Sequence, residues 1–159
     1  MDEQNQIQYI SIEKQAEFKK ELKFLKEEKI PELAKRIDDA RQMGDLSENA
    51  EYHAAREEMA WAQSHVKEVE YILDHAEIID DASVLGKKGT VHVGSVIRVA
   101  TGGKEREFTI VGGQEADPAK GKISNESPTG EAFLGKKKGD DAQVKTPGGM
   151  QTYKILDVA

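Results

Sequence analysis

Two carboxylates, Asp45 and Glu48, lie three residues apart in a short polar segment. On or near a helix this spacing places both side chains on one face. Hard oxygen ligands of this kind suit Mg²⁺, which usually takes one or two carboxylates and keeps several waters. The spacing also fits a capping box, in which Asp45 caps the following helix and Glu48 reaches back. Both interpretations stay open, and a cap alone would tolerate Asn or Ser at position 45.

Three further side chains near this segment have the chemistry to contact nucleic acid. Arg41 precedes the segment and Arg56 follows it, and the arginine fork matches phosphate oxygens. Tyr52 is able to stack on a base or to pack against an opposing helix, and we favour packing. Solvated helix charge is an equally good interpretation for either arginine. We expect His53 to be an exposed helix residue rather than a ligand, and the other histidines show no metal-ligand spacing.

The remaining candidates for chemistry are weak. The run Lys136-Lys137-Lys138 is typical of a solvated surface and, less often, of an electrostatic docking patch. The segment 101–104 has two glycines and a lysine but lacks phosphate-loop spacing, so it predicts a hairpin turn. The chain contains no cysteine, which excludes disulfides, cysteine-based zinc sites and cysteine nucleophiles.

Charge is distributed unevenly along the 159 residues, which allow one domain or two small ones. Residues 1–80 carry a net charge of −9 and residues 81–159 carry +2, giving −7 in total. An acidic first half disfavours general nucleic-acid binding, which depends on phosphate neutralisation. The polar start and the lack of a long apolar stretch predict a cytoplasmic protein without membrane contact.

Two long helices are expected to position the carboxylates. Residues 12 to about 42 have an apolar seam with steps of 4, 3, 5, 3, 4 and 3 from Phe18 to Ala40. The extra residue falls beside Pro31 and predicts a local bend or reset within one helix. Residues 46 to about 78 have a regular heptad seam from Ala55 through Leu73 to Ala76. The short connection forces an antiparallel pair, although a helical pair lying on a larger core is the alternative.

A change of composition near residue 80 predicts a second domain over residues 81–159, after a polar junction at residues 80–83. Strands are expected at 94–100, 108–111, 122–124, 143–145 and 152–158. The turn at residues 146–149 should join the last two strands as a hairpin. Ser127-Pro128 and Gly135 bracket a short helix. The fold class is therefore α+β, with a coiled-coil domain over residues 1–80 and a small sheet with one short helix.

The segment from Gly44 to Ala55 resembles the tip motif of the Gre family of bacterial transcript cleavage factors. Nearly the whole chain follows the family pattern in order. The second half of the resemblance is carried by Ile123-Ser124, Ser127-Pro128, Gly130, Leu134-Gly135, Gly139-Asp140 and Lys145-Thr146-Pro147-Gly148-Gly149. The resemblance implies an antiparallel coiled coil followed by an FKBP-like domain.

The resemblance also implies a function as a transcription elongation factor. The C-terminal domain would dock on bacterial RNA polymerase, and the coiled coil would enter the secondary channel. There Asp45 and Glu48 would share a second Mg²⁺ with the polymerase active site, with no cofactor bound by the protein alone. Arg41, Arg56 and Tyr52 would contact the backtracked 3′ end of the nascent RNA. The polymerase, not this chain, would catalyse RNA cleavage.

For docking on polymerase we expect Ser127, Pro128, Phe133 and Leu134 to make contacts, and we expect the protein to be a monomer. Two other functions stay open. An inhibitory or adaptor paralogue would occupy the channel without stimulating cleavage. An FKBP-type prolyl isomerase is disfavoured, because residues 84–159 hold only three aromatic residues to line a pocket: Phe108, Phe133 and Tyr153.

Overall fold

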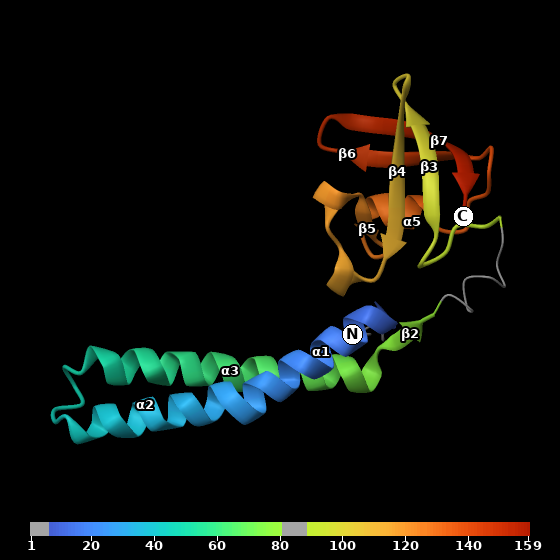
Figure 1. Cartoon of the computed structure of the whole chain (residues 1–159). Coiled ribbons are helices and arrows are strands. Elements are labelled where there is room, and N and C mark those ends of the chain that lie inside the picture. Colours follow the sequence, from blue (N-terminus) through green and yellow to red (C-terminus); the bar gives the residue numbers. More distant parts are fainter. Residues whose placement is uncertain (1–6, 81–88) are drawn as a thin grey trace, which may run out of the picture. The chain divides into compact units, whose positions relative to one another are not determined.

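The computed structural model describes residues 7–80 and 89–159, so most of the predicted junction at residues 80–83 lies outside the described residues. The chain divides into two compact units (Figure 1). One unit is Gln15–His75, and the other combines Met1–Lys14 with Ala76–Ala159. No helix within the described residues is long and apolar enough to cross a membrane.

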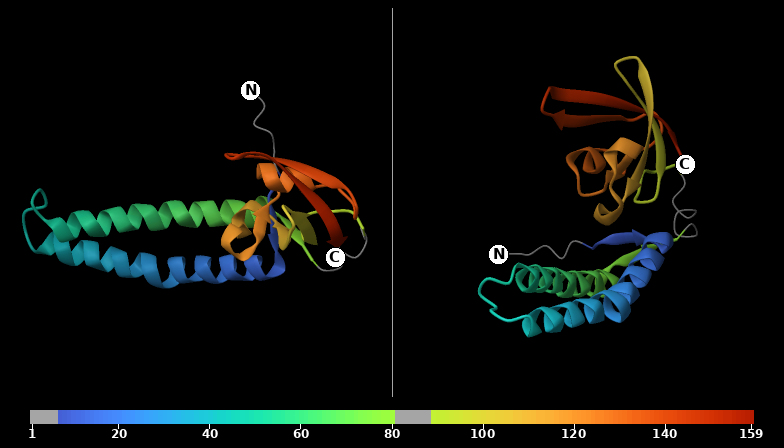
Figure 2. Two further views of the ribbon diagram at one scale, coloured as in Figure 1. Left: turned by 90° about the horizontal axis from the view of Figure 1, so that it is seen from above. Right: turned by 60° about the vertical axis from the view of Figure 1, so that its left-hand side comes forward.

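The first unit is a hairpin of two long helical arms that lie side by side (Figure 2). The first arm runs through α1 (Ile12–Phe24), the π-helical segment η1 (Leu25–Lys29) and α2 (Ile30–Gln42). The second arm is α3 (Ala50–His75). The arms run in opposite directions, so the predicted antiparallel helical hairpin is confirmed.

The predicted reset in the first arm is the π-helical segment η1. The backbone N–H of Ile30 donates to the carbonyl of Leu25, five residues earlier. A π turn holds one residue more than an α turn, so the seam step of five between Leu25 and Ile30 keeps the apolar side chains on one face. Pro31 is the second residue of α2 and does not interrupt the first arm, because the helical backbone is continuous through it.

The seam of the hairpin is closed by both small and large apolar side chains. Ala40, Ala55 and Ala62 are buried, together with Leu25 and Leu33. Toward the end of α3 the buried residue is Ile72, whereas Leu73 is half-buried. The predicted heptad therefore shifts by one position there. The helix also ends at His75 rather than near residue 78.

The helix ends early because the next residues form a strand. Strand β2 (Glu77–Ile79) pairs in parallel with β1 (Tyr9–Ser11). Ile10 lies at the centre of β1 and is almost completely buried. Three-residue strands are too short to show a periodic pattern, so the sequence does not predict this pairing.

The second unit also contains a five-stranded sheet with the order β5-β4-β3-β7-β6. All neighbours are antiparallel except β4 and β5. The strands are β3 (Val96–Thr101), β4 (Lys104–Val111), β5 (Lys122–Ser124), β6 (Asp141–Thr146) and β7 (Gly149–Val158). Short 3-10 turns at η2 (Gly113–Glu115) and η3 (Pro118–Lys120) connect β4 to β5. The predicted strands and both predicted hairpins are confirmed; β4, β6 and β7 are longer than expected, whereas β3 begins two residues later than expected.

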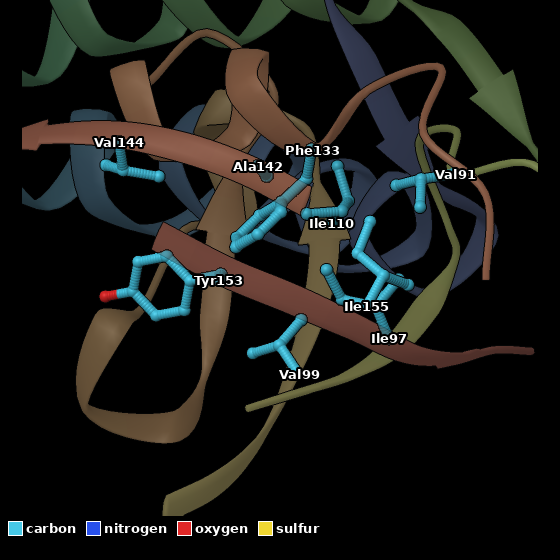
Figure 3. Packing of buried hydrophobic residues seen from close by; sticks show 9 residues of the cluster. All are labelled: Val91, Ile97, Val99, Ile110, Phe133, Ala142, Val144, Tyr153 and Ile155. Atoms are coloured by element: carbon cyan, nitrogen blue, oxygen red, sulfur yellow. The ribbon is translucent and has the colours of Figure 1, made fainter. Parts of the chain in front are cut away.

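The short helix α5 (Pro128–Phe133) packs against the sheet and completes its core. Ser127 caps it by accepting a hydrogen bond from Gly130 N–H at 3.0 Å, as the sequence predicts. The core is formed by Val91, Ile97, Val99, Ile110, Phe133, Ala142, Val144, Tyr153 and Ile155 (Figure 3). The rings of Phe133 and Tyr153 meet edge to face, with centroids 5.5 Å apart.

Candidate functional site

The loop between the two arms of the hairpin comprises residues 43–49 and is called the tip loop below. Its last residue, Asn49, caps α3: Oδ1 accepts from the N–H of Tyr52 at 3.0 Å. Its Nδ2 donates to the carbonyl of Ala40 at 2.7 Å and so ties the end of the first arm to the start of the second. The capping-box prediction for Asp45 and Glu48 is therefore wrong, because α3 begins five residues after Asp45. Asparagine is a preferred cap, so Asn49 was recognisable as an alternative.

Asp45 instead stabilises the tip loop itself. Its Oδ1 accepts hydrogen bonds from the hydroxyl of Ser47 at 2.8 Å and from the backbone N–H of Ser47 at 3.0 Å. These bonds form an Asx turn. They favour the ionised carboxylate and lower the pKa of Asp45, with the Ser47 hydroxyl making the larger contribution. Asp45 is therefore a solvent-exposed anion at neutral pH.

Glu48 is also exposed and lies in the tip loop rather than on a helix face. Within the described parts of the chain, no group of three or more His, Cys, Asp or Glu side chains is arranged to hold a metal. Mg²⁺ usually requires near-octahedral geometry and keeps several waters. Asp45 and Glu48 could thus supply only part of a coordination sphere, with the remaining ligands coming from elsewhere.

An aromatic and cationic cluster lies on the first turns of α3. The guanidinium of Arg56 lies 5.7 Å from the centroid of the Tyr52 ring, a distance typical of a cation–π contact. Tyr52 also meets the ring of His53 edge on, at 5.6 Å. Tyr52 is half-buried, whereas Arg56 and His53 are exposed. These ring contacts of Tyr52 lie within α3 itself, so the predicted packing against the opposing helix is not what they show, and base stacking stays a prediction.

Arg41 is exposed at the end of the first arm, and it forms no ion pair with any residue that the structure describes. The neighbouring Arg36, by contrast, is engaged across the hairpin. It contacts Glu51 at 2.8 Å and Glu58 at 3.1 Å. Glu58 also contacts Lys29 at 3.3 Å, and hydrogen bonding to Lys29 is the main reason that the pKa of Glu58 is lowered. This cluster links the two arms next to the tip loop, and sequence reasoning missed it because its members lie far apart in the chain.

The four predicted docking residues do not form one exposed surface. Pro128 is exposed, and Ser127 and Leu134 are half-buried. Phe133 is 0% exposed and belongs to the core of the sheet. The prediction that Phe133 contacts the polymerase directly is therefore wrong. An aromatic residue in a short helix is as well suited to anchoring that helix in the core as to binding a partner.

Family models account for almost the whole chain. Residues 8–78 match the N-terminal domain of transcription elongation factors, and residues 86–159 match the C-terminal domain described as GreA/GreB. The chain therefore belongs to the GreA/GreB family of transcription elongation factors.

Relatives that match this chain over most of their length include proteins named GreA. The chain is 40% identical to the transcription elongation factor GreA of Halalkalibacterium halodurans, covering 94% of this chain and 95% of that protein. It is 44% identical to GreA of Thermotoga neapolitana, covering 88% and 89%. Among solved structures, the GreA factor homolog 1 of Thermus thermophilus aligns over 97% of this chain and 99% of its own, with 23% identity and a TM-score of 0.44.

Proposed function

We propose that this elongation factor binds bacterial RNA polymerase, inserts its helical hairpin into the secondary channel and stimulates the polymerase's own cleavage of backtracked nascent RNA. Such cleavage would rescue arrested complexes. The observation that carries the proposal is an exposed acidic tip loop at the end of a hairpin in a GreA/GreB family chain. The length of the hairpin supports it, since the 26 residues of α3 span about 40 Å at 1.5 Å per residue.

The role proposed for Asp45 and Glu48 is to complete a Mg²⁺ site whose other ligands belong to the polymerase. Such an ion would help activate a water or stabilise the leaving oxygen in two-metal hydrolysis. The Asx turn around Ser47 fixes the backbone of the tip loop and keeps Asp45 ionised. Two exposed carboxylates do not make a complete site, so the protein alone is not expected to cleave RNA.

The same proposal assigns the extruded RNA 3′ end to Arg41, Arg56 and Tyr52. Arg41 and Arg56 are exposed near the tip loop, and their positive guanidinium groups are able to form hydrogen bonds with negatively charged phosphate oxygens. The Tyr52 ring, partly accessible beside Arg56, offers a surface for base stacking. We assign docking on polymerase to the second unit, with Pro128 and Leu134 as direct contacts. Ser127 would contribute indirectly, as the cap of α5.

The decisive test is Asp45→Asn in a cleavage assay on backtracked elongation complexes with labelled RNA. An asparagine Oδ1 is able to accept the same two hydrogen bonds from Ser47, so the variant removes the charge and retains the turn. Cleavage stimulation should fall by at least about tenfold, the effect of about 1.4 kcal/mol, while polymerase binding stays unchanged. Ser47→Ala is the matched control, because it removes one hydrogen bond and leaves the carboxylate.

Two results would contradict parts of this proposal. If the wild-type protein binds polymerase but produces no shortened, re-extendable transcripts, the adaptor or inhibitory alternative is correct. If Asp45→Asn stimulates cleavage as well as the wild type does, then the carboxylate at position 45 stabilises only the tip loop and has no part in metal binding.

A further inference from the structure

Strand β6 lies at one edge of the five-stranded sheet, where it pairs with β7 on one side only. The strand runs from Asp141 to Thr146 and contains no proline. Within the described parts of the chain, no other strand pairs with its second side. An edge of this kind presents a row of backbone N–H and C=O groups that another strand is able to bind. The edge of β6 is therefore a candidate interaction surface.

The hydrogen bonds between β6 and β7 determine which backbone groups of this edge are free. The N–H of Ile155 donates to the carbonyl of Asp140, directly before β6, at 2.9 Å. In an antiparallel pair, residues that bond to the neighbouring strand alternate with residues that do not. The even-numbered residues of β6 therefore bond to β7. The odd-numbered residues Asp141, Gln143 and Lys145 direct their backbone N–H and C=O groups to the open side.

The side chains of β6 alternate with the same period. Ala142 and Val144 are buried in the core, whereas Asp141, Gln143 and Lys145 are exposed. Neither Asp141 nor Lys145 forms an ion pair with any residue that the structure describes. The residues with free backbone groups are thus also those that carry an acid at one end of the strand and a base at the other.

A second copy of β6 is complementary to this edge. When two β6 strands pair in antiparallel orientation, Gln143 lies opposite its counterpart, and each Asp141 lies opposite the Lys145 of the other copy. Each of these opposed pairs exchanges two hydrogen bonds through the free backbone groups, and the opposite charges attract on the exposed face. Lysine on an edge strand usually opposes pairing, but here the register supplies its counter-charge. Any displaced register leaves Asp141 and Lys145 no longer opposite each other.

We propose that this protein self-associates weakly by antiparallel pairing of the β6 edges of two copies. The contact is isologous, so association stops at a two-fold dimer. This proposal replaces the expectation of a strictly monomeric protein with a monomer–dimer equilibrium. The paired segment, residues 141–145, is small compared with stable interfaces, so we expect a dissociation constant between about 1 µM and about 1 mM.

The test is sedimentation equilibrium of the full-length protein at concentrations from about 1 µM to about 1 mM, a range that covers the expected affinity. The wild type should pass reversibly from monomer to dimer. Asp141→Lys and Lys145→Asp each place like charges opposite each other, so each variant alone should dimerise about tenfold more weakly. Lys104→Asp is the matched control, because it makes the same change at an exposed position of β4, and it should leave dimerisation unchanged.

A mixture of the two charge variants tests the register itself. An Asp141→Lys strand opposite a Lys145→Asp strand again brings opposite charges together, so the mixture should form heterodimers although each variant alone dimerises poorly. Gln143→Pro removes the free N–H at the centre of the edge while the bonds to β7 remain, a change that edge strands tolerate, and it should abolish dimerisation.

Several outcomes would refute the proposal. They are a wild type that stays monomeric up to about 1 mM, edge variants that dimerise as well as the wild type, an equal loss in Lys104→Asp, and a mixture without heterodimers. None of these outcomes affects the proposed role in RNA cleavage, because the tip loop belongs to the other unit.

Discussion

At the scale of single residues, Asn49 connects the two arms of the hairpin, whereas the hydrogen bonds of the nearby Asp45 stay within the tip loop. It caps α3 through Oδ1 and binds the end of the first arm through Nδ2. Asp45 holds only the local turn around Ser47. The helix cap and the tie between the arms thus come from Asn49, whereas Asp45 and Glu48 are exposed.

This division predicts the effect of Asn49→Ala. The variant should destabilise the hairpin by about 1–2 kcal/mol, because the cap and the bridge to Ala40 are lost together. Urea unfolding followed by the fluorescence of Trp61, the single tryptophan of the chain, measures the change. Asn49→Asp is the control, since it retains the capping oxygen and should lose less. Equal stability of wild type and Asn49→Ala would contradict the capping role.

His65 predicts a pH dependence for the hairpin. Its Nε2 lies 2.9 Å from Glu21 on the other arm and its Nδ1 lies 3.3 Å from Glu68. The pKa of His65 is raised above its ordinary value of 6.5, mainly because of its hydrogen bond to Glu21. A raised pKa in the folded state means that this stabilisation is complete below the unfolded pKa and is lost as pH rises through the folded pKa.

The expected outcome is a hairpin that is more stable near pH 5.5 than near pH 8.5, relative to His65→Gln. Helical circular dichroism during urea unfolding is the suitable measurement, because Trp61 stacks on His65 and its fluorescence would respond to pH directly. If wild type and variant show the same pH profile, then the contact between His65 and Glu21 has no net effect on stability.

At the scale of elements, a close approach of α5 to the strand before it explains a glycine. A Cβ built on Gly130 would lie 1.9 Å from the carbonyl oxygen of Ser124. This carbonyl also accepts a hydrogen bond from the capping hydroxyl of Ser127 at 2.7 Å. The start of α5 is therefore packed against backbone that has little freedom to move.

Gly130→Ala should therefore destabilise the sheet by about 1–3 kcal/mol, despite the better helix propensity of alanine. Gly148→Ala is a matched control, because its Cβ would meet only the Thr146 hydroxyl at an ordinary 3.9 Å. Thermal unfolding followed by NMR signals of β3 and β7 reports the difference. A stabilised Gly130→Ala protein would show that α5 is able to shift without cost.

The first arm illustrates how an irregular element keeps a regular seam. The sequence shows one extra residue before Pro31, and the π-helical segment η1 accommodates it. The two arms are then held by ion pairs across the seam, including Lys26 with Glu70 and Arg36 with Glu51. Exposed pairs of this kind contribute little individually, so we expect the buried apolar seam, which includes Leu33, Val66 and Val69, to provide most of the stability.

At the scale of the whole molecule, each unit has a hydrophobic core of its own. The acidic charge is concentrated in residues 1–80, which include the hairpin, whereas residues 81–159 are slightly basic. A long hairpin with a narrow seam needs charged faces to stay solvated, and the small sheet needs a compact apolar core. The low overall hydrophobic content, 37%, follows from this combination.

Local patterns in the sequence were sufficient to determine the two helical arms, the reset beside Pro31, the turns of the two β-hairpins and the capped helix α5. These features depend on periodicity and on residue types within a few positions, so they can be read without knowledge of the fold. The acidic pair at Asp45 and Glu48 was visible for the same reason.

Only the tertiary structure decided the pairing of β1 with β2, the bridge from Asn49 to Ala40 and the burial of Phe133. Each depends on atoms that meet although their residues are distant in the chain or show no local pattern. Asn49 rather than Asp45 caps α3, because α3 begins at Ala50, directly after Asn49.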